Sequence, residues 1–383
     1  GIIPAMIYYG LQILHPSIFL PACIVICAII SLATGSSWTT SATVGIALIG
    51  IGKVLGIPIG MVAGAVISGA YFGDKLSPLS DTTNLAPAMA GGELFSHIRY
   101  MSLTTIPSIV ITLIVFLILS LTQETTGQAD TLTLMAAIKE KFTINGWLFL
   151  VPATVILLIV KKSPPLIALL VGTLMGGIFA LLFQSDILLE ITQSSTLTSE
   201  VAYRAIMDAI SVSTEITTSN ALLNDLFTSG GMEGMLGTIW LIICAMVFGG
   251  IMDAIGALER ISNALLNWAQ TTFQLFASTV ASCLAINLTA SDQYLSIVIP
   301  GKMFAKAYKD RKLAPENLSR TLEDSGTVTS VLIPWNTCGA YQSGVLGVGV
   351  GEYFIYAIFN WISPFMTLLY AAFDIKIKAL KEK

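Results

Sequence analysis

The sequence predicts an all-α, polytopic membrane protein built from two inverted-topology repeats, each with a re-entrant or broken helical hairpin. Of its 383 residues, 55% are hydrophobic and 11% are charged, whereas a soluble domain carries about 25% charged residues. Several apolar stretches approach the roughly 20 residues that a transmembrane helix needs. They are too long and uniform for barrel strands, which alternate over about 10 residues. Other apolar stretches are interrupted by short polar motifs.

These interruptions divide the chain into two related halves joined by a connecting region. The first repeat covers residues 1–122, with its hairpin at 17–52 and its broken segment at 57–92. Connecting spans and an external loop cover 123–236. The second repeat covers 237–383, with its hairpin at 271–304 and its broken segment at 319–347.

The first repeat opens with an apolar run, residues 1–14, which is too short to cross a bilayer. It predicts a helix that starts before Gly1. The hairpin follows, with a tip at 34–43 that is rich in Ser and Thr, and neither apolar arm comfortably spans the membrane alone. Irregular backbone persists at membrane depth only when it is buried in protein or lines a wet cavity. We therefore expect a re-entrant hairpin.

The broken segment of the first repeat holds the densest group of polar residues. Residues 73–84 contain two carboxylates, Asp74 and Asp81, the ammonium group of Lys75 and the helix breaker Pro78. Even mild estimates give roughly 2.5–3.5 kcal/mol for one charged residue at a bilayer centre. Charges that are kept in such surroundings usually handle an ion or a proton.

The middle of the chain alternates plain spans with polar loops. Spans are expected at residues 102–121, 146–160 and 164–183, and a polar loop at 122–145. Residues 184–235 are acidic and predict an external loop with short amphipathic helices, whose charges are solvated.

The second repeat contains elements of the same kinds. A span at 237–258 holds Asp253, and the hairpin breaks at 287–293. A polar helix at 319–334 carries two adjacent acids, Glu323 and Asp324, and the last span is expected at 351–372.

Basic residues orient the chain, because Lys and Arg concentrate in short cytoplasmic loops. The basic positions predict a cytoplasmic C-terminus and two hairpins that enter the membrane from opposite faces. They are Lys161 and Lys162, the stretch from Lys302 to Lys312, and the tail residues Lys376, Lys378, Lys381 and Lys383.

Two short matches support a repeat. Thr34-Gly35-Ser36 and Thr289-Ala290-Ser291 begin the two hairpin tips, and Asp81-Thr82 and Asn336-Thr337 each follow 47 residues after the first residue of the tip. Together with the opposite orientation, these matches fit an inverted-topology repeat, in which broken helices commonly form an ion site.

The acids of the broken segments are the candidate ligands for a cation or a proton. Burial favours the neutral form of a carboxylate, so that H⁺ and Na⁺ can compete for one site. We expect Asp74 and Asp81 to bind Na⁺, and Asp324 and Asp292 to contribute from the second repeat. Asp324 is preferred to Glu323 because it lies deeper toward the apolar end, and adjacent helical residues point about 100° apart.

The alternatives to this site are structural. Asp74 would pair with Lys75 or cap its helix, Asp324 would pair with Arg320, and Asp253 would form a structural hydrogen bond. Accessory candidates are Asp253, Glu323 and Lys75. The neutral side chains expected to line the site are Ser36, Ser37, Ser77, Thr82, Thr83, Asn84, Asn287, Thr289, Ser291, Thr327, Asn336 and Thr337.

Motifs for other chemistry are missing from the sequence. The stretch before Lys53 resembles a phosphate-binding loop only superficially, because Ala47 replaces the first glycine and Val54 replaces the Ser or Thr. No histidine-rich metal cluster, nucleophile triad or cofactor motif appears, and no basic face with interleaved aromatics suggests nucleic acid. Any transport is therefore expected to draw its energy from an ion gradient.

Four polar motifs, in this order, resemble those of the NhaC-type Na⁺/H⁺ antiporters. They are residues 31–38, 73–88, 287–295 and 321–340. The resemblance implies secondary transport of Na⁺ and H⁺ in the bacterial inner membrane, paired hairpins and a longer N-terminal region. It leaves the substrate open, because some relatives exchange malate and lactate.

Three mechanisms therefore remain open. The first is exchange of Na⁺ for H⁺ by alternating access. The second is Na⁺- and H⁺-coupled exchange of small carboxylates, with Lys75 and the helix starts near Ser36 and Ser291 supplying an anion site. The third is a channel. No enzyme activity and no cofactor are expected, and a homodimer is left open.

Overall fold

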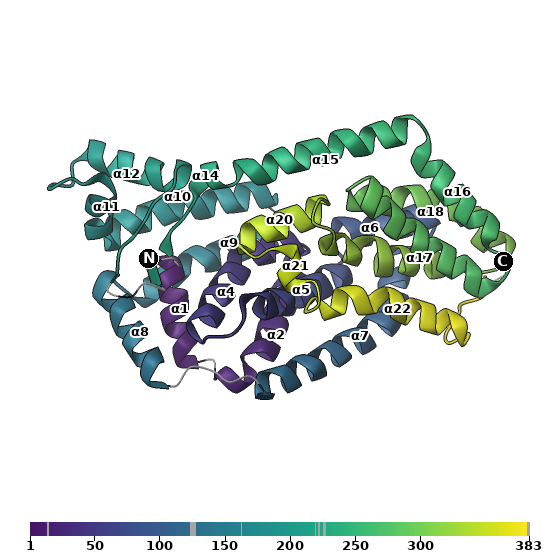
Figure 1. Ribbon diagram of the computed structural model, residues 1–383, viewed down its shortest axis with the longest axis horizontal. Helices are drawn as coiled ribbons and strands as arrows, with labels where there is room; N and C mark the ends of the chain where they lie inside the picture. The colour runs from purple at the N-terminus through teal and green to yellow at the C-terminus, as the bar shows by residue number, and fades with distance from the viewer. Residues whose placement is uncertain are drawn as a thin grey trace.

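The computed structural model describes residues 1–13, 15–122, 128–161, 163–218, 220, 223–224 and 227–380. Within these residues the chain forms helices and two isolated bridges but no β-strand, which confirms the all-α prediction. Figure 1 shows α5 near the centre of the molecule and α15 along its outside. The predictions for Lys162, Lys381 and Lys383 lie outside the described residues.

The helices follow one another in three groups. The first group is α1 (Ile2–Ile13), η1 (Pro16–Ile18), α2 (Phe19–Thr34), α3 (Ser37–Thr40), the π-helix η2 (Ser41–Gly45), α4 (Ile46–Val54), α5 (Ile59–Leu76), α6 (Asp81–Ala90) and α7 (Leu94–Thr122). The second is α8 (Gln128–Lys141), η3 (Gly146–Phe149), α9 (Leu150–Val160), α10 (Pro165–Phe183), α11 (Ser185–Thr192), α12 (Ser199–Ser211), α14 (Gly231–Gly234), α15 (Leu236–Ala254) and α16 (Ala257–Trp268). The third is α17 (Thr272–Thr289), α18 (Gln293–Asp310), α19 (Pro315–Leu322), the π-helix η4 (Glu323–Thr327), η5 (Ser330–Leu332), α20 (Thr337–Leu346), α21 (Val350–Tyr353) and α22 (Ile358–Ala372).

The first and third groups run through elements in the same order. In each, one helix (α2 or α17) leads to a polar tip, and a second (α4 or α18) returns from it. The next segment, α5 or α19–η4, leads to a break, and a helix of 10 residues, α6 or α20, leaves it. The opposite orientation of the two groups in a membrane stays a prediction.

Several helices are long and apolar enough to cross a membrane, so the chain is a multi-pass membrane protein. Two hairpin arms, α2 and α17, lie in candidate spans that are long and apolar enough to cross a membrane alone, whereas neither arm of the first hairpin was expected to do so. The α17 helix continues through Asn287 and Thr289 because their side chains bond inside the protein. The five candidate spans among the described residues are Pro16–Thr34, Leu94–Thr122, Leu166–Phe183, Gly231–Ala254 and Thr272–Thr289.

The connecting region is more helical than the sequence predicted. The α8 helix occupies much of the loop expected at 122–145, because Leu134, Ala137 and Ile138 recur at helical spacing and are buried. The α9 helix has only 11 residues, and the α8 and α9 segments form a pair bent by 89°.

Backbone geometry at the hairpin tips follows from a few residues. Gly35 ends α2 with a left-handed φ of 69°, and a Cβ there would lie 2.7 Å from the carbonyl carbon of Leu79. At the second tip Ser291 has a φ of 60°, and the Asp292 carboxylate caps α18 by accepting bonds from two backbone N–H groups. The first tip therefore lies against the break after α5, and the second tip meets the break before α20, where the Thr337 N–H donates to Ser291 O.

Glycines let the central helix α5 approach α2 closely. Added Cβ atoms at Gly69 and Gly73 would each lie 2.3 Å from a carbonyl oxygen of α2, that of Ile24 and that of Ala28. Small residues at such contacts are typical of helices that pack inside a membrane. The C-terminal end of α5, which carries Asp74 and Lys75, is thereby held deep in the protein.

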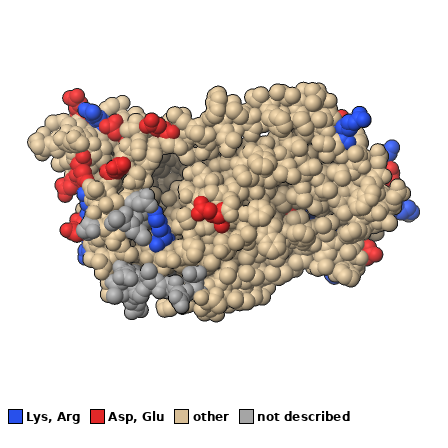
Figure 2. Space-filling view, in the orientation of Figure 1, with Lys and Arg blue, Asp and Glu red and all other residues tan. Residues whose placement is uncertain are grey.

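Charged side chains avoid most of the surface. On the face drawn in Figure 2, acidic and basic residues gather at the two ends of the long axis, and a broad middle with one acidic patch lies between them. Large hydrophobic side chains of α15, such as Trp240 and Phe248, are exposed there at 69% and 52%. This surface fits contact with hydrocarbon.

We predict that Gly35→Ala lowers the thermal stability of the detergent-solubilised protein more than Gly91→Ala does. Both glycines have a left-handed φ, which costs an alanine roughly 1–2 kcal/mol. A Cβ at Gly91 meets nothing within 4 Å, whereas one at Gly35 meets the Leu79 backbone. Equal melting temperatures for the two variants would contradict the close contact between tip and break.

Candidate functional site

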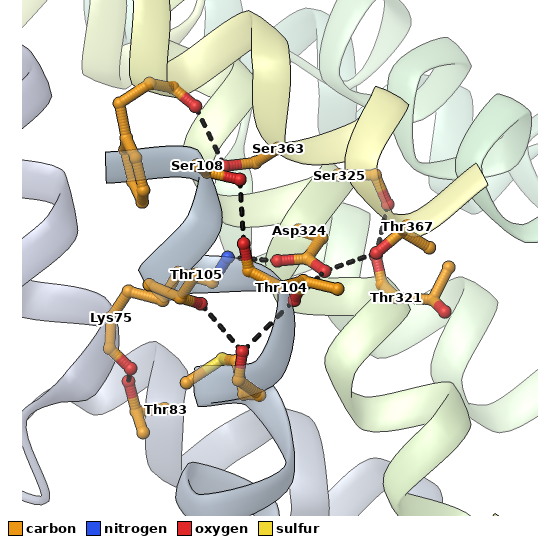
Figure 3. Close-up of polar contacts among 12 residues, drawn as sticks. Lys75, Thr83, Thr104, Thr105, Ser108, Thr321, Asp324, Ser325, Ser363 and Thr367 are labelled. Atoms are coloured by element: carbon orange, nitrogen blue, oxygen red, sulfur yellow. Dashed lines mark hydrogen bonds and ion pairs between the residues drawn. The ribbon is translucent and has the colours of Figure 1, made fainter. Parts of the chain in front are cut away.

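A buried ion pair joins the first and third groups of helices. The Lys75 Nζ at the end of α5 contacts the Asp324 Oδ1 in η4, and both side chains are 0% exposed. Figure 3 shows the two side chains pointing toward each other from helices that belong to different repeats. Removing one partner of such a pair typically destabilises a protein by roughly 3–5 kcal/mol, since the remaining charge stays buried.

The second oxygen of Asp324 is also occupied. Its Oδ2 accepts a bond of 2.8 Å from the Thr104 hydroxyl of α7 and another from the Thr367 hydroxyl of α22 (Figure 3). With three donors, Asp324 is positioned as a neutralised structural acid, and a cation could reach it only if a donor moved away.

The neighbouring acid, Glu323, is in the opposite situation. It is 0% exposed, and neither carboxylate oxygen has a hydrogen-bond partner among the described residues. The groups that act on it electrostatically or lie near it are Lys75, Thr327, Asp74 and Thr82. An orphaned buried carboxylate of this kind calls for an ion, a proton or water as partner. The sequence-based preference for Asp324 as the open acid is therefore not what the geometry favours.

Asp74 connects α5 to the tip of the first hairpin. Its Oδ2 accepts bonds from the backbone N–H of Ser37 at 3.0 Å and from the Ser37 hydroxyl at 2.7 Å. The Thr83 hydroxyl donates to the backbone oxygens of Asp74 and Lys75 at 3.3 and 3.0 Å. One Asp74 oxygen is thus held by α3, and Lys75, the alternative partner considered for Asp74, pairs with Asp324 instead.

The remaining predicted residues of the first break lie around Asp74. Asp81 is exposed in the first turn of α6 and acts on Asp74 through space. The Asn84 amide donates to the oxygens of Pro78 and Ser80 at 3.0 and 2.7 Å. The Ser77 hydroxyl accepts from the N–H of Leu79, the Thr82 hydroxyl lies 3.2 Å from that of Ser80, and Ser36 caps α3.

Polar side chains also join the tip and the break of the second repeat. The Asn336 amide donates to the side chain and backbone oxygens of Asn287 at 3.1 and 3.2 Å. The Asn287 amide in turn donates to the backbone oxygen of Gly326 at 2.7 Å, and the N–H of Thr337 donates to Ser291 O at 2.9 Å. These residues, which were expected to line a site, bond to each other and leave few free oxygens.

Three predicted residues have local roles in the structure. Asp292 caps α18, and the Thr289 hydroxyl donates to the backbone oxygen of Ala285 on its own helix. Asp253 is exposed near the end of α15, away from the buried pair. By contrast, Thr327 lies beside Glu323 with a buried hydroxyl that has no partner among the described residues.

Sequence reasoning missed the hydroxyls that hold Asp324. Thr104 lies in a stretch that was expected to be a plain span, and Thr367 lies in the last one. A signal was present in α7, where Thr104, Ser108 and Thr112 recur every four residues and all are buried. A polar stripe on one face of an apolar helix indicates that this face meets protein.

We predict that Thr104→Val destabilises the detergent-solubilised protein by about 1.5–3 kcal/mol, the usual contribution of a hydrogen bond to a buried charge. Thr105→Val is the matched control, because the Thr105 hydroxyl donates only to the Met101 backbone oxygen of its own helix. The measurement is thermal unfolding of both variants. Equal destabilisation would show that the Asp324 contact contributes nothing special.

Comparison with known proteins agrees with this architecture. Residues 69–375 match the Na⁺/H⁺ antiporter family. The chain is 38% identical to the Na⁺/H⁺ antiporter NhaC of Alkalihalophilus pseudofirmus over 98% of its own length and 79% of that protein. It is 37% identical to a malate-2H⁺/Na⁺-lactate antiporter of Bacillus subtilis (95% and 74% covered) and 35% identical to the arginine/ornithine antiporter ArcD of Halobacterium salinarum (96% and 74% covered). The chain therefore belongs to the Na⁺/H⁺ antiporter family.

Proposed function

We propose that this protein exchanges Na⁺ for H⁺ across the bacterial inner membrane by alternating access. The observation that carries the proposal is the buried Glu323 carboxylate, for which the described residues provide no hydrogen-bond donor although they provide three for its neighbour Asp324. Family membership supports the same chemistry. A desolvated carboxylate with an open coordination sphere can hold either a proton or a hard alkali cation.

In this proposal the cation site lies between the two repeats. Glu323 and Asp74 supply the charged oxygens, and the nearby hydroxyls of Thr82 and Thr327 supply neutral ones. Asp81, exposed at the start of α6, serves as the acid at the approach to the site. Because one set of oxygens holds Na⁺ or protons in turn, binding of one species displaces the other.

The broken helices give the site its route to both sides of the membrane. A helix end that is not continued leaves backbone groups free to turn toward an ion. Breaks at 77–80 and 333–336 separate α5 from α6 and η5 from α20. We propose that motion at these breaks, around the Lys75–Asp324 pair, opens the Glu323 region to one side at a time. The C-terminus is proposed to be cytoplasmic, enzyme activity is not proposed, and a homodimer stays a prediction.

A second candidate is coupled exchange of small carboxylates. It is favoured by the names of two relatives, one a malate and lactate exchanger and the other an exchanger of amino acids. It needs a free cationic group for the substrate carboxylate. Lys75, the cation expected for this role, is held by Asp324, whereas Arg320 has no hydrogen-bond partner among the described residues, so the preference for exchange of Na⁺ for H⁺ rests on the open Glu323 carboxylate.

We predict that Glu323→Gln and Asp74→Asn each lower Na⁺-driven proton flux at least about tenfold, because neither amide can bind the exchanged proton or charge-balance Na⁺. The assay uses proteoliposomes with an internal pH-sensitive dye. Asp186→Asn, in an exposed position of α11, is the control and should keep the parent rate. Parent-level flux in both site variants would refute this site.

Substrate identity is tested with the same vesicles. We predict that Na⁺ moves protons in the absence of any carboxylate, and that malate, lactate, arginine and ornithine do not accelerate it. Flux that requires one of these carboxylates would refute exchange of Na⁺ for H⁺ and favour the second candidate. Na⁺ flux without opposing proton flux would indicate a channel.

A further inference from the structure

Arg320 is a buried cation without an anion. Its side chain is 0% exposed, and none of its three guanidinium nitrogens has a hydrogen-bond partner among the described residues. The guanidinium carbon lies 4.6 Å from the ring centroid of Tyr100 and 5.7 Å from that of Tyr370. Cation–π contacts offset only part of the desolvation of a guanidinium group. Such an arrangement is expected for a charge that has its partner in another state of the protein.

The position of Arg320 identifies that partner. Arg320 precedes Asp324 by one helical turn, and both side chains face the same two helices. Arg320 lies against Tyr100 of α7 and Tyr370 of α22, and Asp324 bonds to a threonine of each of these helices. Residues four apart on a helix are within reach of an ion pair, and a guanidinium fork matches both oxygens of a carboxylate.

The count of buried charges leads to the same pair. The charged side chains of α5, α19 and η4 that are 0% exposed are the cations Lys75 and Arg320 and the acids Glu323 and Asp324. Lys75 pairs with Asp324, and this leaves Arg320 and Glu323 without partners among the described residues. The other titratable groups around this region are His97 and Tyr100 of α7, Tyr308 of α18, Tyr370 of α22, Asp74 of α5, and Glu316, which pairs with Lys378.

We propose that Arg320 is the second counter-ion of Asp324 and pairs with it whenever Lys75 moves to Glu323 in the carrier that holds neither Na⁺ nor H⁺. This inference rests on the proposed function. An empty carrier contains an ionised Glu323, and Lys75 is the cation beside it. When Lys75 moves there, Asp324 would remain as a bare buried charge unless Arg320 replaced Lys75. Arg320 thus acts as a positioning residue through Lys75.

The kinetic test compares Arg320→Gln with Arg320→Lys. Without Arg320, Lys75 stays on Asp324 and competes less with Na⁺ for Glu323, so Na⁺ binds more tightly and leaves more slowly. We expect Arg320→Gln to lower both the half-saturating Na⁺ concentration and the maximal rate about fivefold. Arg320→Lys should restore both only in part, because the lysine keeps the charge but lacks the fork that matches both carboxylate oxygens. Arg260→Gln, at an exposed position of α16, is the matched control and should change neither.

A lower maximal rate at an unchanged half-saturating Na⁺ concentration would overturn the proposal, since a purely structural role gives that result. Loss of malate or lactate flux alone, with Na⁺-driven proton flux intact, would also overturn it and would assign the guanidinium to a transported anion.

A stability test does not depend on transport and uses Lys75→Met with and without Asp324→Asn. If Arg320 replaces Lys75, Asp324 stays paired in the single variant. The melting temperature of the single variant in detergent is then no lower than that of the double variant, at both pH 6 and pH 9. If the single variant melts clearly below the double variant at pH 9, Arg320 does not reach Asp324 and the proposal fails. This outcome would leave the Na⁺/H⁺ exchange proposal itself standing.

Discussion

The buried pair between Lys75 and Asp324 is the interaction on which the arrangement of this protein depends. It joins residues that lie 249 positions apart and belong to the first and third groups of helices. Both charges have left water entirely, so the pair persists only because the threonines of α7 and α22 complete the coordination of the acid. Four segments, α5, η4, α7 and α22, therefore converge on one carboxylate (Figure 3).

Because Asp324 is paired with Lys75, its neighbour Glu323 is the acid without a hydrogen-bond partner among the described residues. Glu323 and Asp324 are adjacent in a π-helix, and they point toward different surroundings. Asp324 faces the threonines of α7 and α22, whereas Glu323 is near Asp74 and Thr82. π-helical turns are often found at functional sites. The result is one paired acid at the junction of the first and third groups of helices and one acid that has no hydrogen-bond partner among the described residues.

Close packing around the breaks is the second requirement. Gly69 and Gly73 allow α5 to touch the backbone of α2, and Gly35 allows the first tip to touch Leu79. In the second repeat, contacts between asparagine side chains perform the corresponding task. Irregular backbone is tolerated inside a membrane only when the surrounding protein satisfies its polar groups. The contacts that stabilise the breaks therefore also stabilise the site.

The sequence by itself determined the membrane class, the helical fold, the places where helices break and the acids that gather there. These follow from local properties: apolar length, the left-handed freedom of Gly35, the missing N–H of Pro78 and the clustering of hydroxyls and carboxylates. The tertiary structure alone decided which acid is neutralised, because Lys75, Thr104 and Thr367 come from three other helices. It also decided that Arg320 lies unpaired in the interior. Glu323 and Asp324 are adjacent acids, so the sequence around them does not tell which one is paired. The orientation of η4 relative to the neighbouring helices places Asp324 against Lys75, Thr104 and Thr367 and leaves Glu323 without a hydrogen-bond partner among the described residues.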